Sequence, residues 1–143
     1  MEKIYSKIEP SRLLHIVCRL SEIEDQEGNR IDIIEPENFI QCSSLNMASG
    51  KTFKPHKHIF KKRTYENQIA QESWVVIRGS VRCLFYDVDD IIIAKPILYA
   101  GDVSFTLGGG HTYQILEDDT IVYEYKTGPY EGQKMDKVFL EED

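Results

Sequence analysis

Four side chains in this sequence are of the types that bind a divalent transition metal. His56 and His58 are separated by one residue, and His111 follows three consecutive glycines; the chain has four histidines in all. Glu72 lies between these two places, seven residues before Gly79. Three imidazoles and one carboxylate would leave coordination positions open for water or substrate, as catalytic metal sites do.

Each of these residues alone has an ordinary explanation. An isolated pair such as His56 and His58 is most often structural or on the surface, and a single carboxylate such as Glu72 is usually solvated. A histidine after glycines, such as His111, is most often a turn residue. The hypothesis of a metal site therefore depends on the combination of the residue types with the strands predicted around them.

Strand periodicity explains how these side chains could converge. On a strand, residues i and i+2 point to the same face, so His56 and His58 would share a face. Glu72 comes just before a predicted strand, and His111 begins another one after the glycine run. Tyr113 shares the face of His111, and is predicted to be a catalytic acid or base, with a substrate contact or a structural aromatic residue as alternatives.

Short strands separated by turns dominate the sequence from about residue 38 onward. The predicted strands cover residues 74–77, 81–86, 91–99, 103–107, 112–116 and 121–126. Pro96 places the third of these at a sheet edge or at a bulge. This spacing is typical of an all-β antiparallel barrel or sandwich.

The N-terminal part is ambiguous. The apolar residues of 13–23 fit a helical stripe, but His15–Cys18 is rich in β-formers, and we predict a short strand there. His15 lies outside the predicted ligand set and is expected to be structural.

Composition limits the classes of function. The 143 residues suit one domain, and a formal net charge of −7 argues against nucleic-acid binding. No apolar run approaches the roughly 20 residues that span a bilayer, and Met1–Tyr5 does not begin a signal peptide.

The three cysteines, Cys18, Cys42 and Cys83, are odd in number and widely spaced. We interpret them as free thiols in a reducing compartment, which predicts a cytoplasmic protein.

The spacing of these residues resembles the first motif of the cupin superfamily. That motif is a glycine, five residues, two histidines separated by one residue, three or four residues, a glutamate, six residues and a glycine. Here five residues separate Gly50 from His56, and six separate Glu72 from Gly79. The departure is the thirteen residues between His58 and Glu72.

The segment Gly101–His111 resembles the second cupin motif. Leu107 stands where the motif has proline, the spacing from glycine to histidine is shorter by one, and no asparagine follows. The long gap in the first motif leaves Glu66 as a rival to Glu72 for the carboxylate ligand.

The resemblance covers roughly residues 38–126 and implies a double-stranded β-helix, the cupin jelly-roll barrel. It implies that the metal is Fe, Mn, Ni or Zn and that its ligands are His56, His58, Glu72 and His111. Segments 71–76, 109–113 and 123–130 are also similar to small cupins encoded among bacterial surface-polysaccharide genes. We expect an N-terminal extension over residues 1–37, a cupin domain over 38–130 and a C-terminal tail over 131–143.

Three functions follow as hypotheses. The first is a metal-binding cupin that acts on a small polar metabolite, a carbohydrate or nucleotide sugar, as an isomerase, epimerase or dioxygenase-like enzyme. The second is a metal-free isomerase or epimerase of nucleotide sugars, with His56 or His58 as base and Tyr113 as acid. The third is a non-enzymatic module that senses a sugar derivative. Exposed edge strands also predict a homodimer.

Overall fold

The fold is built on two antiparallel sheets. The computed structural model describes residues 1–24, 30–58, 68–129 and 132–140. The larger sheet has five strands, in the order β1 (Glu2–Tyr5), β2 (Leu13–Cys18), β9 (Val103–Thr106), β5 (Glu72–Arg78) and β11 (Ile121–Lys126). The second sheet is built on β6 (Ser80–Tyr86), with β10 (His111–Ile115) on one edge and β7 (Ile92–Ala94) and β8 (Ile97–Tyr99) on the other.

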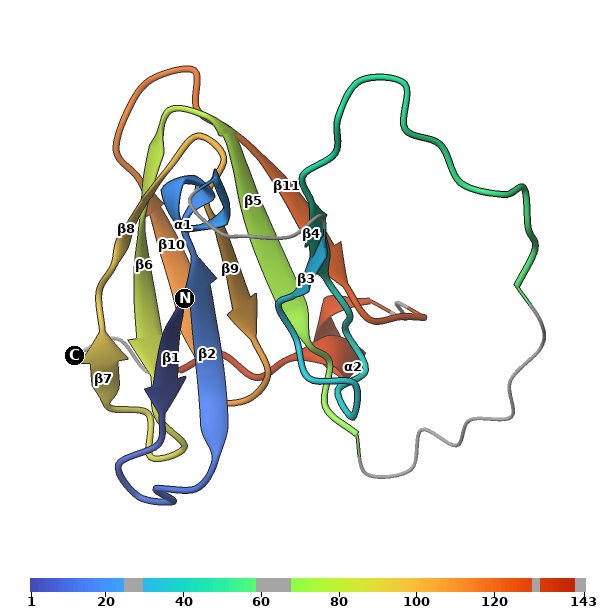
Figure 1. The fold of residues 1–143 in the computed structure, drawn as a ribbon. Coiled ribbons are helices and arrows are strands. Elements are labelled where there is room, and N and C mark those ends of the chain that lie inside the picture. Colours follow the sequence, from blue (N-terminus) through green and yellow to red (C-terminus); the bar gives the residue numbers. More distant parts are fainter. Residues whose placement is uncertain (25–29, 59–67, 130–131, 141–143) are drawn as a thin grey trace.

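Three smaller elements complete the described part of the chain (Figure 1). A two-stranded ladder pairs β3 (Arg30–Asp32) with β4 (Ser43–Leu45), and the helices α1 (Leu20–Glu24) and α2 (Gln133–Asp136) are short. No helix in these residues is long and apolar enough to cross a membrane.

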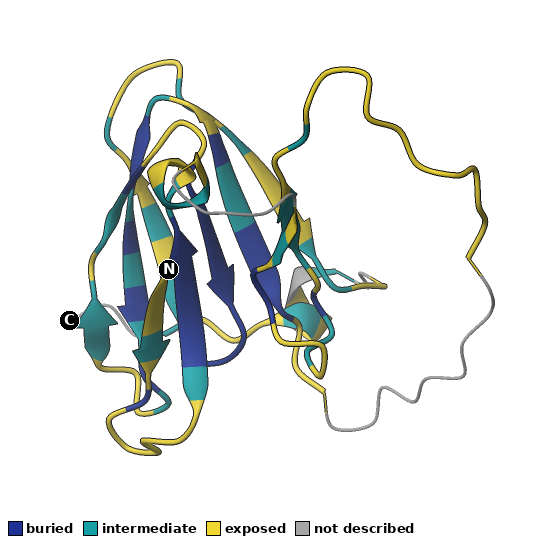
Figure 2. Ribbon diagram, in the orientation of Figure 1, coloured by how far each residue is buried: buried dark blue, intermediate teal, exposed yellow. Residues whose placement is uncertain are grey.

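The apolar core has two parts, one on each face of the five-stranded sheet. Between the sheets, Val17 and Val76 pack with Val81, Cys83 and Phe85 of β6. On the outer face, residues of β2 and β9 pack against the segment that contains Ile33, Ile34 and Ile40. The sheet is thus covered on both faces, and Figure 2 shows β2 and β9 buried over most of their length.

The all-β prediction is confirmed for the described residues, and so are the predicted strands over 74–77, 81–86, 103–107, 112–116 and 121–126. The predicted strand over 91–99 is interrupted before Ile97 and lies along one edge of β6, where Pro96 was expected to place it. The N-terminal strand is confirmed as β2, and β1 and β2 belong to the larger sheet. In the described chain the sheets do not close into a barrel.

The predicted strand at His56 and His58 is wrong. Both residues lie in the long connection between β4 and β5, where residues 48–58 form no strand and are all exposed (Figure 1). A strand needs a partner for its backbone groups, and this connection pairs with no strand of the described chain. The i, i+2 spacing alone therefore did not place the two histidines on a sheet.

Candidate functional site

A row of polar residues crosses the inner face of the five-stranded sheet near one end. The register pairs Lys126 of β11 with Glu72 of β5, Glu72 with Thr106 of β9, and Thr106 with His15 of β2. Paired residues on adjacent strands project to the same face. Glu72, Thr106 and His15 are buried, and burying polar groups is unfavourable unless each finds a partner.

Glu72 finds its partner on the opposite sheet. Its Oε1 lies 3.0 Å from Nε2 of His111, the first residue of β10. The Glu72 side chain is 10% exposed and that of His111 is 23% exposed, so the pair is shielded but reachable. Burial raises the pKa of Glu72, but the hydrogen bond from His111 and the charges of His111, Lys137 and Lys126 outweigh it and leave the pKa below its usual value.

This contact fixes the orientation and the tautomer of His111. Glu72 keeps its charge, so its carboxylate accepts and His111 Nε2–H donates. In the neutral ring Nδ1 then carries a lone pair, and it has no hydrogen-bond partner among the described residues. A carboxylate that holds an imidazole in this way prepares the second nitrogen to accept a proton or to bind a metal.

Tyr113 lies beside this pair on the same strand. Its ring stacks on Trp74 of β5 at 3.9 Å between ring centroids with an interplanar angle of 5°, and its centroid lies 5.6 Å from that of His111. The hydroxyl group is 3.2 Å from Oγ of Ser104. Burial raises the pKa of the phenol, so Tyr113 is a neutral hydrogen-bond donor. The Trp74–Tyr113 stack forms an aromatic wall next to His111.

His15 ends the polar row and is fully buried. Its Nε2 lies 3.1 Å from the Tyr86 carbonyl oxygen, and its Nδ1 lies 3.1 Å from Thr106 Oγ1. A carbonyl only accepts, so Nε2 carries the proton and Nδ1 accepts from the Thr106 hydroxyl. The ring stacks on Phe85 at 4.4 Å, and burial lowers its pKa to about 4. The neutral ring thus ties β2 to β9 and β6.

The structure brings together only part of the predicted ligand set. His56 and His58 lie near each other, with ring centroids 5.5 Å apart, and His56 Nδ1 donates to the Lys54 carbonyl at 3.0 Å. The described residues contain no group of three or more potential metal ligands, so this pair and the Glu72–His111 pair are separate. In this structure His56 and His58 do not meet Glu72 and His111, and Glu66 lies outside the described residues.

Sequence reasoning missed three residues of this site: Thr106, Ser104 and Lys126. Each is a common residue type on a strand, and no spacing marks it. Only the register between strands distant in sequence places these side chains beside Glu72, His15 and Tyr113. One signal in the sequence could have found two of them: Ser104 and Thr106 alternate along a buried strand, and buried hydroxyl groups need hydrogen-bond partners.

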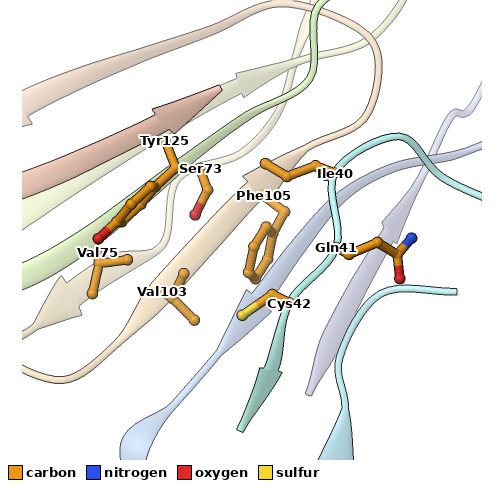
Figure 3. Close-up of a pocket in the computed structure, with 8 residues that line it drawn as sticks. All are labelled: Ile40, Gln41, Cys42, Ser73, Val75, Val103, Phe105 and Tyr125. Atoms are coloured by element: carbon orange, nitrogen blue, oxygen red, sulfur yellow. The ribbon is translucent and has the colours of Figure 1, made fainter. Parts of the chain in front are cut away.

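A cavity of about 240 Å³ lies on the opposite face of the five-stranded sheet. Its wall is mainly apolar and consists of Ile40, Gln41, Cys42, Ser73, Val75, Val103, Phe105 and Tyr125 (Figure 3). Ser73 and Val75 alternate with Glu72 and Trp74 along β5, so the sheet separates this cavity from the polar row. Burial raises the pKa of the Cys42 thiol in this wall, which favours the protonated thiol.

Comparison of the chain with protein-family models, with curated proteins and with solved structures found no match.

Proposed function

We propose that this protein binds a small polar metabolite, a carbohydrate or nucleotide sugar, between its sheets and isomerises or epimerises it by acid–base catalysis. One observation carries the proposal: the 3.0 Å contact from His111 Nε2 to Glu72 at a shielded but reachable position. It leaves Nδ1 of His111 as a base and provides a carboxylate to stabilise the imidazolium that forms. The resemblance to cupins of polysaccharide gene clusters supports the substrate class.

In this mechanism His111 removes a proton from a carbon beside a carbonyl group of the substrate. In an isomerisation the proton returns to the neighbouring carbon, and in an epimerisation the same carbon is reprotonated on its opposite face. Glu72 remains ionised and holds the ring in place throughout. Tyr113 is the second proton-bearing group, and the stack with Trp74 offers an aromatic surface to a sugar ring or a base. The proposed base is thus His111 rather than His56 or His58, which are exposed in the connection before β5.

The test is incorporation of solvent deuterium into a panel of nucleotide sugars, followed by mass spectrometry. Glu72→Gln should slow exchange by about 100-fold or more, the range that general acid–base groups contribute. The matched control is Glu124→Gln, on the neighbouring strand, whose carboxylate accepts from Trp74 Nε1 at 3.3 Å and does not contact His111. Exchange that is equally fast in Glu72→Gln would refute the assignment.

We propose divalent-metal binding as the second candidate function. In its favour, Glu72 and His111 are two of the four predicted ligands and lie in contact. The other two, His56 and His58, lie in the exposed connection before β5. In the described chain β10 is an edge strand, so its outer edge is available to pair with this connection. Elemental analysis of untagged protein tests this: metal well below one equivalent, with no uptake on reconstitution, removes the candidate.

Chelation separates the two candidates. Deuterium exchange that persists in strong chelator supports the metal-free reaction, and exchange that is lost and then restored by one metal supports the metal-dependent one. Thermal stabilisation by a nucleotide sugar without exchange would instead indicate a binding or sensing module.

The proposal also includes a homodimer in the cytoplasm. The unpaired edges of both sheets support the dimer, and the three cysteines, all free thiols, support a reducing compartment. Sedimentation analysis of the purified chain tests the oligomeric state.

A further inference from the structure

The C-terminal segment Gly132–Leu140 passes over the end of the sheets where Glu72 and His111 meet. It begins with α2, beside the ends of β5 and β11, and continues across the end of the sheets (Figure 1). Two contacts between described residues join it to the rest of the chain, one at the end of β11 and one just before β10.

The first contact is an ion pair between Lys126 and Asp136. Nζ of Lys126 lies 2.8 Å from Oδ2 of Asp136, and the two side chains are 18% and 13% exposed. Lys126 is the register partner of Glu72 at the end of β11, so this pair places α2 next to the candidate site. Shielding from water makes such a pair more persistent than one on the open surface.

The second contact joins Leu140 to the start of β10. A Cβ atom on Gly110 would lie 2.8 Å from Cδ1 of Leu140, so the absence of a side chain there makes room for Leu140. Gly110 directly precedes His111. Residues 137–139 therefore span the distance from Asp136, which is paired with Lys126 of the larger sheet, to Leu140, which lies against Gly110 just before β10.

Among the described residues, the remaining support for this segment is the attraction between the charges of Lys137 and Glu72 and a small amount of burial. Val138 is 90% exposed and Phe139 is 72% exposed, so neither contributes much burial. Gly132, at the start, has φ of +99°, a left-handed conformation that glycine adopts without strain and that suits a hinge. A segment with so few buried contacts opens locally at low free-energy cost.

We infer that Gly132–Leu140 is a strap that closes the Glu72–His111 site, latched by the Lys126–Asp136 ion pair and seated by Leu140 on Gly110. Substrate enters when the latch opens, and the strap then closes behind it and excludes water. The inference rests on the proposed function only in taking Glu72 and His111 as the site.

Labelling of histidines with diethyl pyrocarbonate, resolved by peptide mass spectrometry, tests the strap without a substrate. The reagent modifies accessible imidazoles, and His111 is 23% exposed with the strap in place, so a rise of its rate above the wild-type rate reports opening. His56 and His58 are exposed and serve as internal standards, and His15 is fully buried and reports unfolding. Turnover is not needed, so the strap and the proposed function can fail independently.

Asp136→Asn should raise the labelling rate of His111 by about 5-fold, because loss of an ion pair of this kind raises the equilibrium constant for opening of the strap by about that factor. The rates at His56 and His58 should not change. The matched control is Lys134→Gln, which removes an exposed charge from the same helix. Leu140→Ala, which removes the second contact, should act in the same direction as Asp136→Asn.

The result that overturns the strap is a wild-type rate at His111 in both Asp136→Asn and Leu140→Ala while His15 stays unlabelled. If His15 becomes labelled in Asp136→Asn, that variant has unfolded, and Leu140→Ala alone decides the outcome.

Discussion

Acidification should destabilise this protein through His15 before its carboxylates are protonated. Burial lowers the pKa of His15 from 6.5 to about 4. The unfolded chain therefore binds the proton first, and stability is full above about pH 6.5 and falls until about pH 4. A difference of two to three pKa units at about 1.4 kcal/mol each corresponds to a loss of roughly 3 kcal/mol.

Urea unfolding followed by the fluorescence of Trp74, the single tryptophan, measures this loss. With a slope of about 2 kcal/mol per molar urea, the midpoint should fall by about 1.5 M between pH 6.5 and pH 4. Glu72 and Asp87 have lowered pKa values, so their contributions are lost only below their usual values of 4.5 and 3.8. His15 therefore acts alone between about pH 6.5 and pH 5, and its window overlaps with that of Glu72 only between about pH 4.5 and pH 4.

The matched variant is His15→Gln, whose amide does not titrate but can still accept from Thr106 and donate to the Tyr86 carbonyl. It should lower stability at pH 7 by about 1–3 kcal/mol and flatten the dependence between pH 6.5 and pH 4. A wild-type midpoint that is constant over this range, or an equally steep decline in His15→Gln, would refute the reasoning about His15.

Two further substitutions test how the ends of the sheets are held. The buried carboxylate of Asp102 accepts hydrogen bonds from Arg19 Nη1 at 3.0 Å and from two backbone N–H groups. Asp102→Ala should therefore lower the free energy of unfolding by about 2–4 kcal/mol, measured with urea. An unchanged midpoint would contradict this. Gly79 has φ of +80°, and a Cβ there would lie 2.2 Å from Thr120 Oγ1. Gly79→Ala should therefore cost more than Gly50→Ala, where φ is +82° in open space and the expected cost is about 1–2 kcal/mol. Equal costs would show that Thr120 moves aside freely.

The strands were predictable because their signal is local. Val81, Cys83 and Phe85 alternate with the less buried residues Arg82, Leu84 and Tyr86, and all three are buried between the sheets. Period-two alternation is a direct consequence of one buried face and needs no knowledge of the partner strand. The ambiguity at residues 13–18 had a physical cause too: β2 is covered on both faces, so its buried residues are nearly continuous and do not alternate.

The polar row was not predictable, because it depends on register between strands far apart in the sequence. Lys126, Glu72, Thr106 and His15 meet only after β11, β5, β9 and β2 pair. Local patterns show that Thr106 is on a strand but not which residue it faces. The same limit explains why His15, expected to be structural, could not be connected to Thr106 and Tyr86 beforehand.

The predicted ligands divide according to whether their segments have pairing partners. Glu72 and His111 each begin a strand that is paired on at least one side, and they meet across the sheets at 3.0 Å. His56 and His58 belong to a connection with no paired backbone in the described residues, and no third ligand approaches them. Because Glu72 keeps its charge and already orients His111, this pair can hold or move a proton without the other two histidines. Acid–base chemistry therefore needs only the residues that the sheets themselves position, whereas a four-ligand centre needs the connection before β5 to move.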